Sequence, residues 1–338
     1  MIVTMRKGAD RNEINNVMQR AKSLGLEVQV NLGTDITVLA LLGSNTGQLS
    51  TELFAILPGV DSVTRIMKPY KLAAREFKRD NTVISVDQVE IGKKRIVVMA
   101  GPCAVESREQ LFEAARVVKE AGAKILRGGA FKPRTSPFSF QGLQQAGLEL
   151  LSEVRTHFSM PVITEVVDPH DVSLVVQHAD ILQVGSRNMQ NYPLLTNLGK
   201  IKTPVVLKRG FSNSVTEWLT AADYLLAGAN SNVILCERGI RTFEDSIRFS
   251  LDISAIPVIK RSCHLPIIVD PSHAAGHHDL VPALAKAAIA AGADGLLIEV
   301  HPNPKEALVD GLQSLDPFEF VQLMKELQLI AKSIGREI

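Results

Sequence analysis

The hydrophobic positions of the chain follow two arrangements, a short mixed one first and a long alternating one after it. In residues 1–68 the apolar runs predict strands at 2–4, 27–32, 36–42 and 60–67. Amphipathic segments predict one helix that begins at the N-cap Asp10 and ends at Gly25, and a second over 49–56. The order βαββαβ is that of a ferredoxin-like domain. Such modules either sense small molecules or only mediate oligomerisation, and the pattern leaves both readings open.

Residues 69–81 are charged and weakly patterned, and we expect them to link this domain to a larger one at 82–338. Apolar runs at 82–89 and 91–99 predict strands around a turn at Gly92-Lys93-Lys94. We expect the first of them to belong to a hairpin that caps the bottom of the domain that follows.

From residue 96 onward, short β-branched runs alternate with amphipathic segments. The predicted strands are 96–100, 124–126, 161–164, 181–184, 205–208, 232–235, 266–269 and 295–298. The predicted helices are 108–121, 142–157, 169–178, 192–200, 215–227, 246–258, 280–291 and 317–334. Eight strands alternating with eight helices predict a (β/α)8 TIM barrel, an α/β fold. The alternative is an open doubly wound sheet, but no Gly-x-Gly-x-x-Gly fingerprint follows the first strand.

Composition narrows the class of protein. Lys and Arg (37) nearly balance Asp and Glu (36) in 338 residues, which argues against a nucleic-acid binder. Hydrophobic residues make up 46%, yet no apolar run reaches the roughly 18 residues of a membrane-spanning helix, and we expect no signal peptide. The three cysteines are widely spaced and lack a paired-metal or redox spacing. We therefore expect a soluble, reduced, cytoplasmic protein.

Six cations stand at or just after the predicted strand ends, where a TIM barrel gathers its functional residues. They are Arg127, Lys132, Arg134, Arg187, Lys208 and Arg238. Burying so many like charges together is costly unless anions neutralise them. Two glycines and two prolines in 126–137 suit a stiff loop that approaches a phosphate closely. The pattern predicts a site for two phosphorylated substrates, one of which also bears a carboxylate.

A second set, at three strand ends and in the long loop after the last strand, has the chemistry of a metal site. It consists of Cys103, His273, Glu299 and Asp310. Each alone has an ordinary structural explanation, but one thiol, one imidazole and two carboxylates together suit a divalent transition metal and do not select among Mn, Fe, Co, Cu and Zn. We leave His277 and His278 out, because Gly276 and Pro271-Ser272 predict a loop without a helical i,i+4 pair. Cys236 and Cys263 are expected to be packing or surface thiols.

Several long motifs resemble those of 3-deoxy-D-arabino-heptulosonate 7-phosphate (DAHP) synthases. They are Gly101-Pro102-Cys103-Ala104-Val105-Glu106-Ser107, the stretch 126–137, Leu207-Lys208-Arg209-Gly210, Cys236-Glu237-Arg238-Gly239, Val269-Asp270-Pro271-Ser272-His273 and Ile298-Glu299-Val300-His301. The likeness covers the barrel, and the first domain resembles the regulatory domain of the short type I-beta form. The resemblance implies that phosphoenolpyruvate condenses with erythrose 4-phosphate, the first step of the shikimate pathway to the aromatic amino acids.

The resemblance also implies a role for individual residues. Cys103, His273, Glu299 and Asp310 would hold the metal ion. Phosphoenolpyruvate would be held by Arg127, Lys132, Arg187, Lys208 and Arg238, with Glu165 and the backbone of Gly185 and Ser186 near its reacting end. Erythrose 4-phosphate would be held by Lys132, Pro133, Arg134 and Thr135, with Asp310 near its hydroxyls. Lys132 is our candidate proton donor. The resemblance further implies a homotetramer and Tyr or Phe as a feedback inhibitor bound to the first domain.

Three other functions compete with this one. A 3-deoxy-D-manno-octulosonate 8-phosphate (KDO8P) synthase would share the barrel and phosphoenolpyruvate, but its sugar-phosphate loop reads Ala-Asn-Arg-Ser where this chain has Lys132-Pro133-Arg134-Thr135, and a regulatory module is not expected in it. A Schiff-base aldolase would use Lys208 as its nucleophile. A non-catalytic sensor of aromatic amino acids would keep the barrel only as a scaffold. The complete cation and metal sets favour a DAHP synthase.

Overall fold

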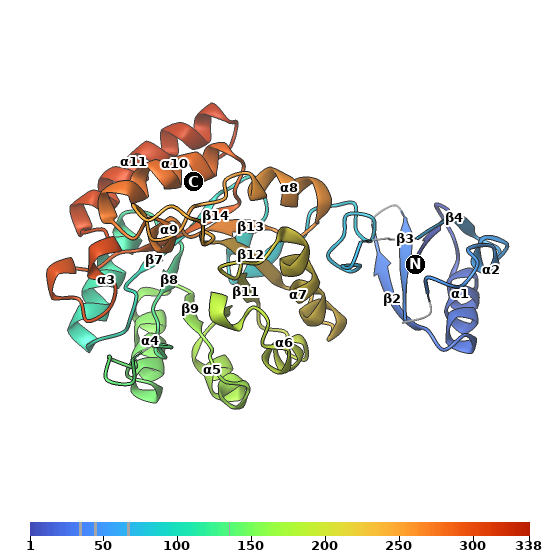
Figure 1. The fold of residues 1–338 in the computed structure, drawn as a ribbon, viewed down its shortest axis with the longest axis horizontal. Coiled ribbons are helices and arrows are strands. Elements are labelled where there is room, and N and C mark those ends of the chain that lie inside the picture. Colours follow the sequence, from blue (N-terminus) through green and yellow to red (C-terminus); the bar gives the residue numbers. More distant parts are fainter. Residues whose placement is uncertain (34–35, 44–45, 66–67, 135) are drawn as a thin grey trace. The chain divides into compact units, whose positions relative to one another are not determined.

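The structure is a computed structural model that describes residues 1–33, 36–43, 46–65, 68–134 and 136–338. It contains two compact units (Figure 1). The first comprises residues 1–81 with 262–264, and the second comprises 82–261 with 265–338. Residues 69–81, predicted as a linker, thus group with the first unit. No helix of the described residues has the length and apolar character needed to cross a membrane.

The first unit is a four-stranded antiparallel sheet with two helices. Its elements are β1 (Ile2–Met5), α1 (Arg11–Ser23), β2 (Glu27–Leu32), β3 (Thr37–Leu42), α2 (Glu52–Ala55) and β4 (Val60–Thr64). The strand order β2-β3-β1-β4 confirms the predicted ferredoxin-like arrangement. Asp10 begins α1 with a capping box that includes Glu13. Val17, Leu39 and Phe54 are fully buried in the core of this unit.

The second unit is a closed parallel barrel, which confirms the predicted fold (Figure 1). Its strands are β7 (Val97–Gly101), β8 (Ile125–Arg127), β9 (Val162–Glu165), β10 (Ile181–Val184), β11 (Val205–Lys208), β12 (Val233–Glu237), β13 (Ile267–Val269) and β14 (Gly295–Glu299). Its helices are α3 (Arg108–Glu120), α4 (Gln145–Phe158), α5 (Val172–His178), α6 (Tyr192–Gly199), α7 (Val215–Ala227), α8 (Ala255–Ser262), α9 (Pro271–Ala275), α10 (Val281–Ala290) and α11 (Pro317–Ser333). Because all eight strands run parallel, their C-terminal ends open at one mouth.

The barrel closes between β14 and β7 with Glu299 opposite Gly101. This register brings Glu299 level with the turn that carries Cys103. Gly101 is required at this point: its φ is +149°, and a Cβ there would come within 2.2 Å of the carbonyl oxygen of Arg127.

A hairpin caps the barrel as predicted, but its turn was placed wrongly. The strands are β5 (Ile84–Val86) and β6 (Val89–Ile91), so the turn lies at Asp87-Gln88 and not at 92–94. Asp87 takes a φ of +49°, a left-handed conformation that aspartate tolerates better than most residues. Ile84 and Ile91 pack on the barrel core near Val97 and Ile125, at the end of the barrel opposite the mouth.

The segment after β12 differs most from its prediction. A helix was predicted at 246–258, but the chain from 238 to 254 is irregular and α8 begins only at Ala255. A bridge between Ile240 and Ser250 folds the segment back on itself, and the amide of Phe249 donates to the Ala274 carbonyl oxygen at 2.9 Å. Tertiary hydrogen bonds of this kind override local helix propensity.

Candidate active site

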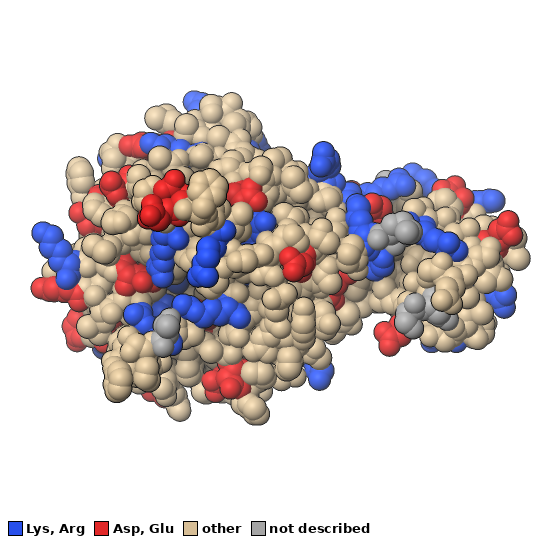
Figure 2. All heavy atoms as spheres, in the orientation of Figure 1, with Lys and Arg blue, Asp and Glu red and all other residues tan. Residues whose placement is uncertain are grey.

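The mouth of the barrel holds a pocket of about 490 Å³ that is rich in cations. In Figure 2, Lys and Arg side chains gather around a hollow in the barrel unit. All six predicted cations line this pocket, and so do Pro133, Glu165, Gly185, Ser186, His273 and Asp310. Thr135, also predicted for the site, lies outside the described residues. The barrel therefore brings the predicted phosphate-binding residues together around one space.

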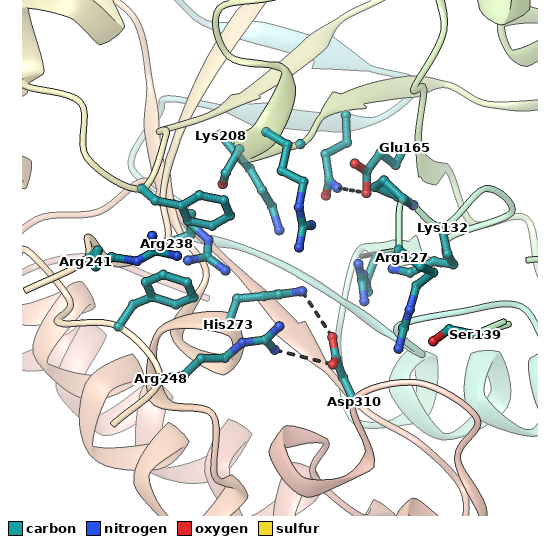
Figure 3. A pocket seen from close by; sticks show the side chains of 18 of the residues that line it. Arg127, Lys132, Ser139, Glu165, Lys208, Arg238, Arg241, Arg248, His273 and Asp310 are labelled. Atoms are coloured by element: carbon teal, nitrogen blue, oxygen red, sulfur yellow. Dashed lines mark hydrogen bonds and ion pairs between the residues drawn. The ribbon is translucent and has the colours of Figure 1, made fainter. Parts of the chain in front are cut away.

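The four predicted metal ligands also meet here. One donor atom of each of Cys103, His273, Glu299 and Asp310 lies within 4.8 Å of the others. The Nε2 atom of His273 lies 3.8 Å from Asp310 Oδ2 (Figure 3). The same atom lies 3.4 Å from Glu299 Oε1. The Sγ atom of Cys103 lies 3.4 Å from Asp310 Oδ2. These residues come from the ends of three different strands and from the long loop after β14.

The residues around this set orient it. Asp270 is buried, and its Oδ2 lies 2.8 Å from Nδ1 of His273 and 2.5 Å from Nζ of Lys208. Nη1 of Arg127 donates to Glu299 Oε1 at 2.7 Å, and Nε2 of Gln313 donates to Glu299 Oε2 at 2.6 Å. A carboxylate behind a ligating histidine and donors on a ligating carboxylate are the usual outer contacts of a metal site.

Electrostatics support the same assignment. Burial lowers the pKa of His273, so its imidazole is neutral near pH 7, as ligation requires. Burial alone would raise the pKa of Asp310, but His273, which is protonated at low pH, and the charges of Arg248 and Lys132 lower it to about 2. Burial and the Glu299 carboxylate raise the pKa of the Cys103 thiol to about 12. A bound cation would reverse this shift, because metal coordination deprotonates a thiol. The donor set fits a divalent transition metal.

Lys132 and Glu165 face the pocket next to this set. Nζ of Lys132 donates to both Sγ and the carbonyl oxygen of Cys103 at 3.1 Å. Burial opposes the charged form of Lys132, but the nearby Cys103 and Glu165 charges outweigh it and raise its pKa. Glu165 is also buried and accepts a hydrogen bond from Gln183 Nε2 at 3.2 Å (Figure 3). Lys132 is therefore a charged donor at the edge of the metal-ligand set.

Several buried polar atoms of pocket-lining residues have no hydrogen-bond partner among the described residues. Within the part of the chain that the structure describes, the Oγ of Ser186, the Nη1 of Arg238 and the Nε of Arg127 are buried and have no hydrogen-bond partner. Buried donors normally have partners, so these atoms indicate a ligand. A phosphate or carboxylate accepts hydrogen bonds from such groups.

Sequence reasoning missed several residues of the site. They are Gln183, Phe211, Arg241, Arg248, Phe249, Asp270 and Gln313. Asp270 belongs to the motif Val269-Asp270-Pro271-Ser272-His273. Its place three residues before the predicted ligand His273 was the signal that could have identified it as a partner of that histidine. Arg248 falls in the helix predicted at 246–258, and the prediction gave Arg241 no role. The excluded His278 bonds Glu319 instead, at 2.7 Å. The predicted loop at 271–273 is wrong, because these residues form the start of α9.

Comparisons with known proteins agree with this site. Residues 76–334 match the DAHP synthetase I family. The chain belongs to this family. Residues 1–68 match the DAHP synthase ferredoxin-like domain, so both units have counterparts among these enzymes.

Individual relatives cover the whole chain or only part of it. The phospho-2-dehydro-3-deoxyheptonate aldolase of Thermotoga maritima is 46% identical over 338 residues, 100% of both chains. Its crystal structure superposes with a TM-score of 0.80 and covers 99% of this chain and 98% of that one. The 2-dehydro-3-deoxyphosphooctonate aldolase of Francisella tularensis subsp. mediasiatica is 29% identical and covers 74% of this chain and 98% of its own. The similarity to the octonate aldolase is thus weaker and partial.

Proposed function

We propose that this chain is a DAHP synthase, an enzyme that condenses phosphoenolpyruvate and D-erythrose 4-phosphate with water to give DAHP and phosphate. The observation that carries the proposal is the pocket itself, where cations from separate strand ends surround one space beside a thiol, an imidazole and two carboxylates. Dense positive charge suits two phosphorylated substrates, and the ligand set suits one divalent ion among Mn, Fe, Co, Cu and Zn. Membership of the DAHP synthetase I family supports the same reaction.

Phosphoenolpyruvate would lie among Arg127, Lys132, Arg187, Lys208 and Arg238, with Glu165, Gly185 and Ser186 near its reacting end. Erythrose 4-phosphate would lie against Lys132, Pro133, Arg134 and Thr135, with its hydroxyls toward Asp310. The paired cations Arg127 and Lys208 are held by buried carboxylates, so they do not have to reorganise when a substrate binds. Holding both substrates in one pocket makes their reaction effectively unimolecular, which lowers its entropic barrier.

The chain's own residues account for the movement of protons and phosphate. A metal ion held by Cys103, His273, Glu299 and Asp310 would polarise the aldehyde oxygen as a Lewis acid. A bond forms between C3 of phosphoenolpyruvate and the aldehyde carbon, and Nζ of Lys132 donates its proton to the resulting alkoxide oxygen. Water adds to C2, which the new bond leaves positively charged, and one of its protons restores the Lys132 ammonium. The resulting C2 hydroxyl becomes the ketone as the C2–O bond to phosphate breaks, and phosphate leaves with the second proton toward Arg187 and Arg238. Glu165 lines the same pocket and would orient that water.

Regulation and assembly belong to the same proposal. Residues 1–68 would bind Tyr or Phe as a feedback inhibitor, and the enzyme would act as a homotetramer in the cytoplasm. Residues 69–81 would link that domain to the catalytic domain, residues 82–338. The match of residues 1–68 to the DAHP synthase ferredoxin-like domain supports a regulatory part.

Phosphate release tests the proposal. Metal-stripped protein is assayed with phosphoenolpyruvate and either erythrose 4-phosphate or arabinose 5-phosphate, with and without Mn(II), and with added Tyr or Phe. Metal-dependent turnover of the four-carbon sugar is expected, with inhibition by Tyr or Phe. Turnover of arabinose 5-phosphate alone would move the chain to the KDO8P synthases, and activity that survives chelation would remove the metal from the mechanism. Activity without inhibition would leave residues 1–68 an assembly role.

A further inference from the structure

Arg238 is held differently from the other buried cations of the pocket. Arg127 pairs with Glu299 at 2.7 Å, and Lys208 pairs with Asp270 at 2.5 Å. Arg238 is just as buried, with 3% of its surface exposed, but among the described residues it makes no ion pair with a carboxylate. Its guanidinium instead lies against a stacked pair of phenylalanine rings.

These rings, Phe211 and Phe249, form what we call the aromatic pair. They stack with their centroids 5.0 Å apart and their planes 10° from parallel. The guanidinium carbon of Arg238 lies 4.2 Å from the centroid of Phe249 and 4.9 Å from that of Phe211 (Figure 3). Both distances fall within the range of a favourable cation–π interaction. A ring face attracts the cation but does not occupy its N–H groups, so the donors of Arg238 stay available.

The chain builds the aromatic pair from two separate loops. Phe211 follows β11, and its carbonyl oxygen accepts a hydrogen bond from the Arg241 amide at 2.7 Å. Phe249 lies in the irregular segment after β12 and is tied to α9 through Ala274. Gly239 makes room for it, since a Cβ at that position would come within 2.7 Å of the Phe249 Cβ. The contact is therefore fixed by its surroundings and is not a chance approach of surface side chains.

A carboxylate partner would hold Arg238 equally well but would weaken its attraction for an anion. A partner carboxylate cancels much of the charge that a phosphate would otherwise meet. Burial lowers the pKa of Arg238 to about 10, so the group still carries its charge at neutral pH. Arg238 lines the pocket together with Arg187 and Ser186, and its Nη1 has no hydrogen-bond partner among the described residues.

We propose that Phe211 and Phe249 are positioning residues that hold the Arg238 guanidinium through cation–π contact and leave its N–H donors and its charge for the phosphate group of phosphoenolpyruvate. This inference rests on the proposed function for the identity of the substrate, but not for the presence of an anion at Arg238. The ring, and not only the bulk of the side chain, is what the position requires.

The experiment compares Phe249→Leu, which removes the ring, with Phe249→Tyr, which keeps it. Phe112→Leu is the matched control, because the Arg108 guanidinium lies 4.1 Å from the Phe112 centroid but on helix α3, outside the pocket. Steady-state kinetics give KM and kcat for each substrate on the Mn(II)-loaded enzyme. Isothermal titration calorimetry with phosphoenolpyruvate alone, and with inorganic phosphate, gives the affinity without turnover.

Phe249→Leu is expected to raise the KM and Kd for phosphoenolpyruvate about 5- to 30-fold. The kcat and the KM for erythrose 4-phosphate should change less than about two-fold, since a contact that is equally strong in the ground and transition states acts on KM alone. Phe249→Tyr should restore most of the affinity, and Phe112→Leu should match the wild type.

Two results would overturn the inference: unchanged affinity of folded Phe249→Leu for phosphoenolpyruvate and phosphate, or an equal loss in Phe249→Tyr. If Phe249→Leu does not fold, Phe211→Leu and Phe211→Tyr carry the same comparison. A different result would refute the proposed function without refuting this inference: no turnover of either substrate by the wild type. In that case loss of inorganic phosphate binding in Phe249→Leu, with retention in Phe249→Tyr, still supports the role of the aromatic pair.

Discussion

Gln313 offers the sharpest test of the metal site, because it touches a predicted ligand but is not one. It is buried, with 2% of its surface exposed, and both ends of its amide are used. Nε2 donates to Glu299 Oε2 at 2.6 Å, and Oε1 accepts from Arg248 Nη1 at 2.6 Å. Arg248 in turn lies 3.4 Å from Asp310 Oδ1, so Gln313 connects two of the four ligands.

The substitution Gln313→Leu keeps a side chain of similar size and removes both hydrogen bonds. A hydrogen bond to a charged group contributes about 1.5–3 kcal/mol, and loss of an outer contact of this kind typically weakens metal binding about 10- to 100-fold. Glu299 would lose one of its two orienting contacts and keep only Arg127, and Arg248 would be left to pair with Asp310 and compete with the metal. Both effects weaken metal binding, so we expect the Mn(II) affinity to fall about 10- to 100-fold.

Metal affinity is measured directly on metal-stripped protein, by competition with a fluorescent chelator. The rise in melting temperature on adding Mn(II) is a second measure, since a ligand stabilises the folded state according to its affinity. Gln322→Leu is the control: its amide also donates to a glutamate, Glu326, at 3.1 Å, but on the exposed face of α11. We expect that control to bind within about two-fold of the wild type. Equal or tighter Mn(II) binding by folded Gln313→Leu would refute the reasoning.

Three further predictions follow from single contacts. Lys132→Met is expected to lower kcat at least about 100-fold; a variant that lost only substrate affinity would exclude Lys132 as the proton donor. Cys103→Ser should abolish the thiolate-to-metal charge-transfer band of Co(II)-loaded protein, and a band that persists would mean that a different thiol is the ligand. Burial lowers the pKa of His264 to about 4, so the unfolded state takes up a proton near pH 6.5 and the folded state does not. The free energy of unfolding should therefore be highest above pH 6.5 and fall by about 3 kcal/mol as the pH drops from 6.5 to 4. Melting temperatures against pH check this, with a slope that flattens in His264→Gln but not in a variant of the exposed His170.

The barrel and its mouth could be predicted from the sequence because both depend on local signals. The alternation of short apolar runs with amphipathic segments is visible in windows of ten to twenty residues, and it specifies parallel strands joined by helices. Residues at the ends of parallel strands must then meet at one face, whatever the details of packing. That rule was enough to predict that Cys103, His273 and Glu299 meet, and Asp310 was added from the loop that follows the last strand.

Tertiary structure decided the parts that depend on contacts between distant segments. The turn at Asp87-Gln88 is set by how Ile84 and Ile91 pack under the barrel. The irregular chain at 238–254 has helix-like periodicity but is held by hydrogen bonds to α9 and to Phe211, which a local pattern does not contain.

The residues that orient the site also depend on contacts between distant segments of the chain. Gln313 reaches Glu299 across 14 positions and Arg248 across 65, and Lys208 reaches Asp270 across 62. No local period or spacing encodes such pairs, because they exist only once the barrel has closed. Local patterns in the sequence were therefore sufficient to predict the fold and to propose the residues that carry the chemistry, whereas the neighbours that orient and neutralise those residues come together only in the closed barrel.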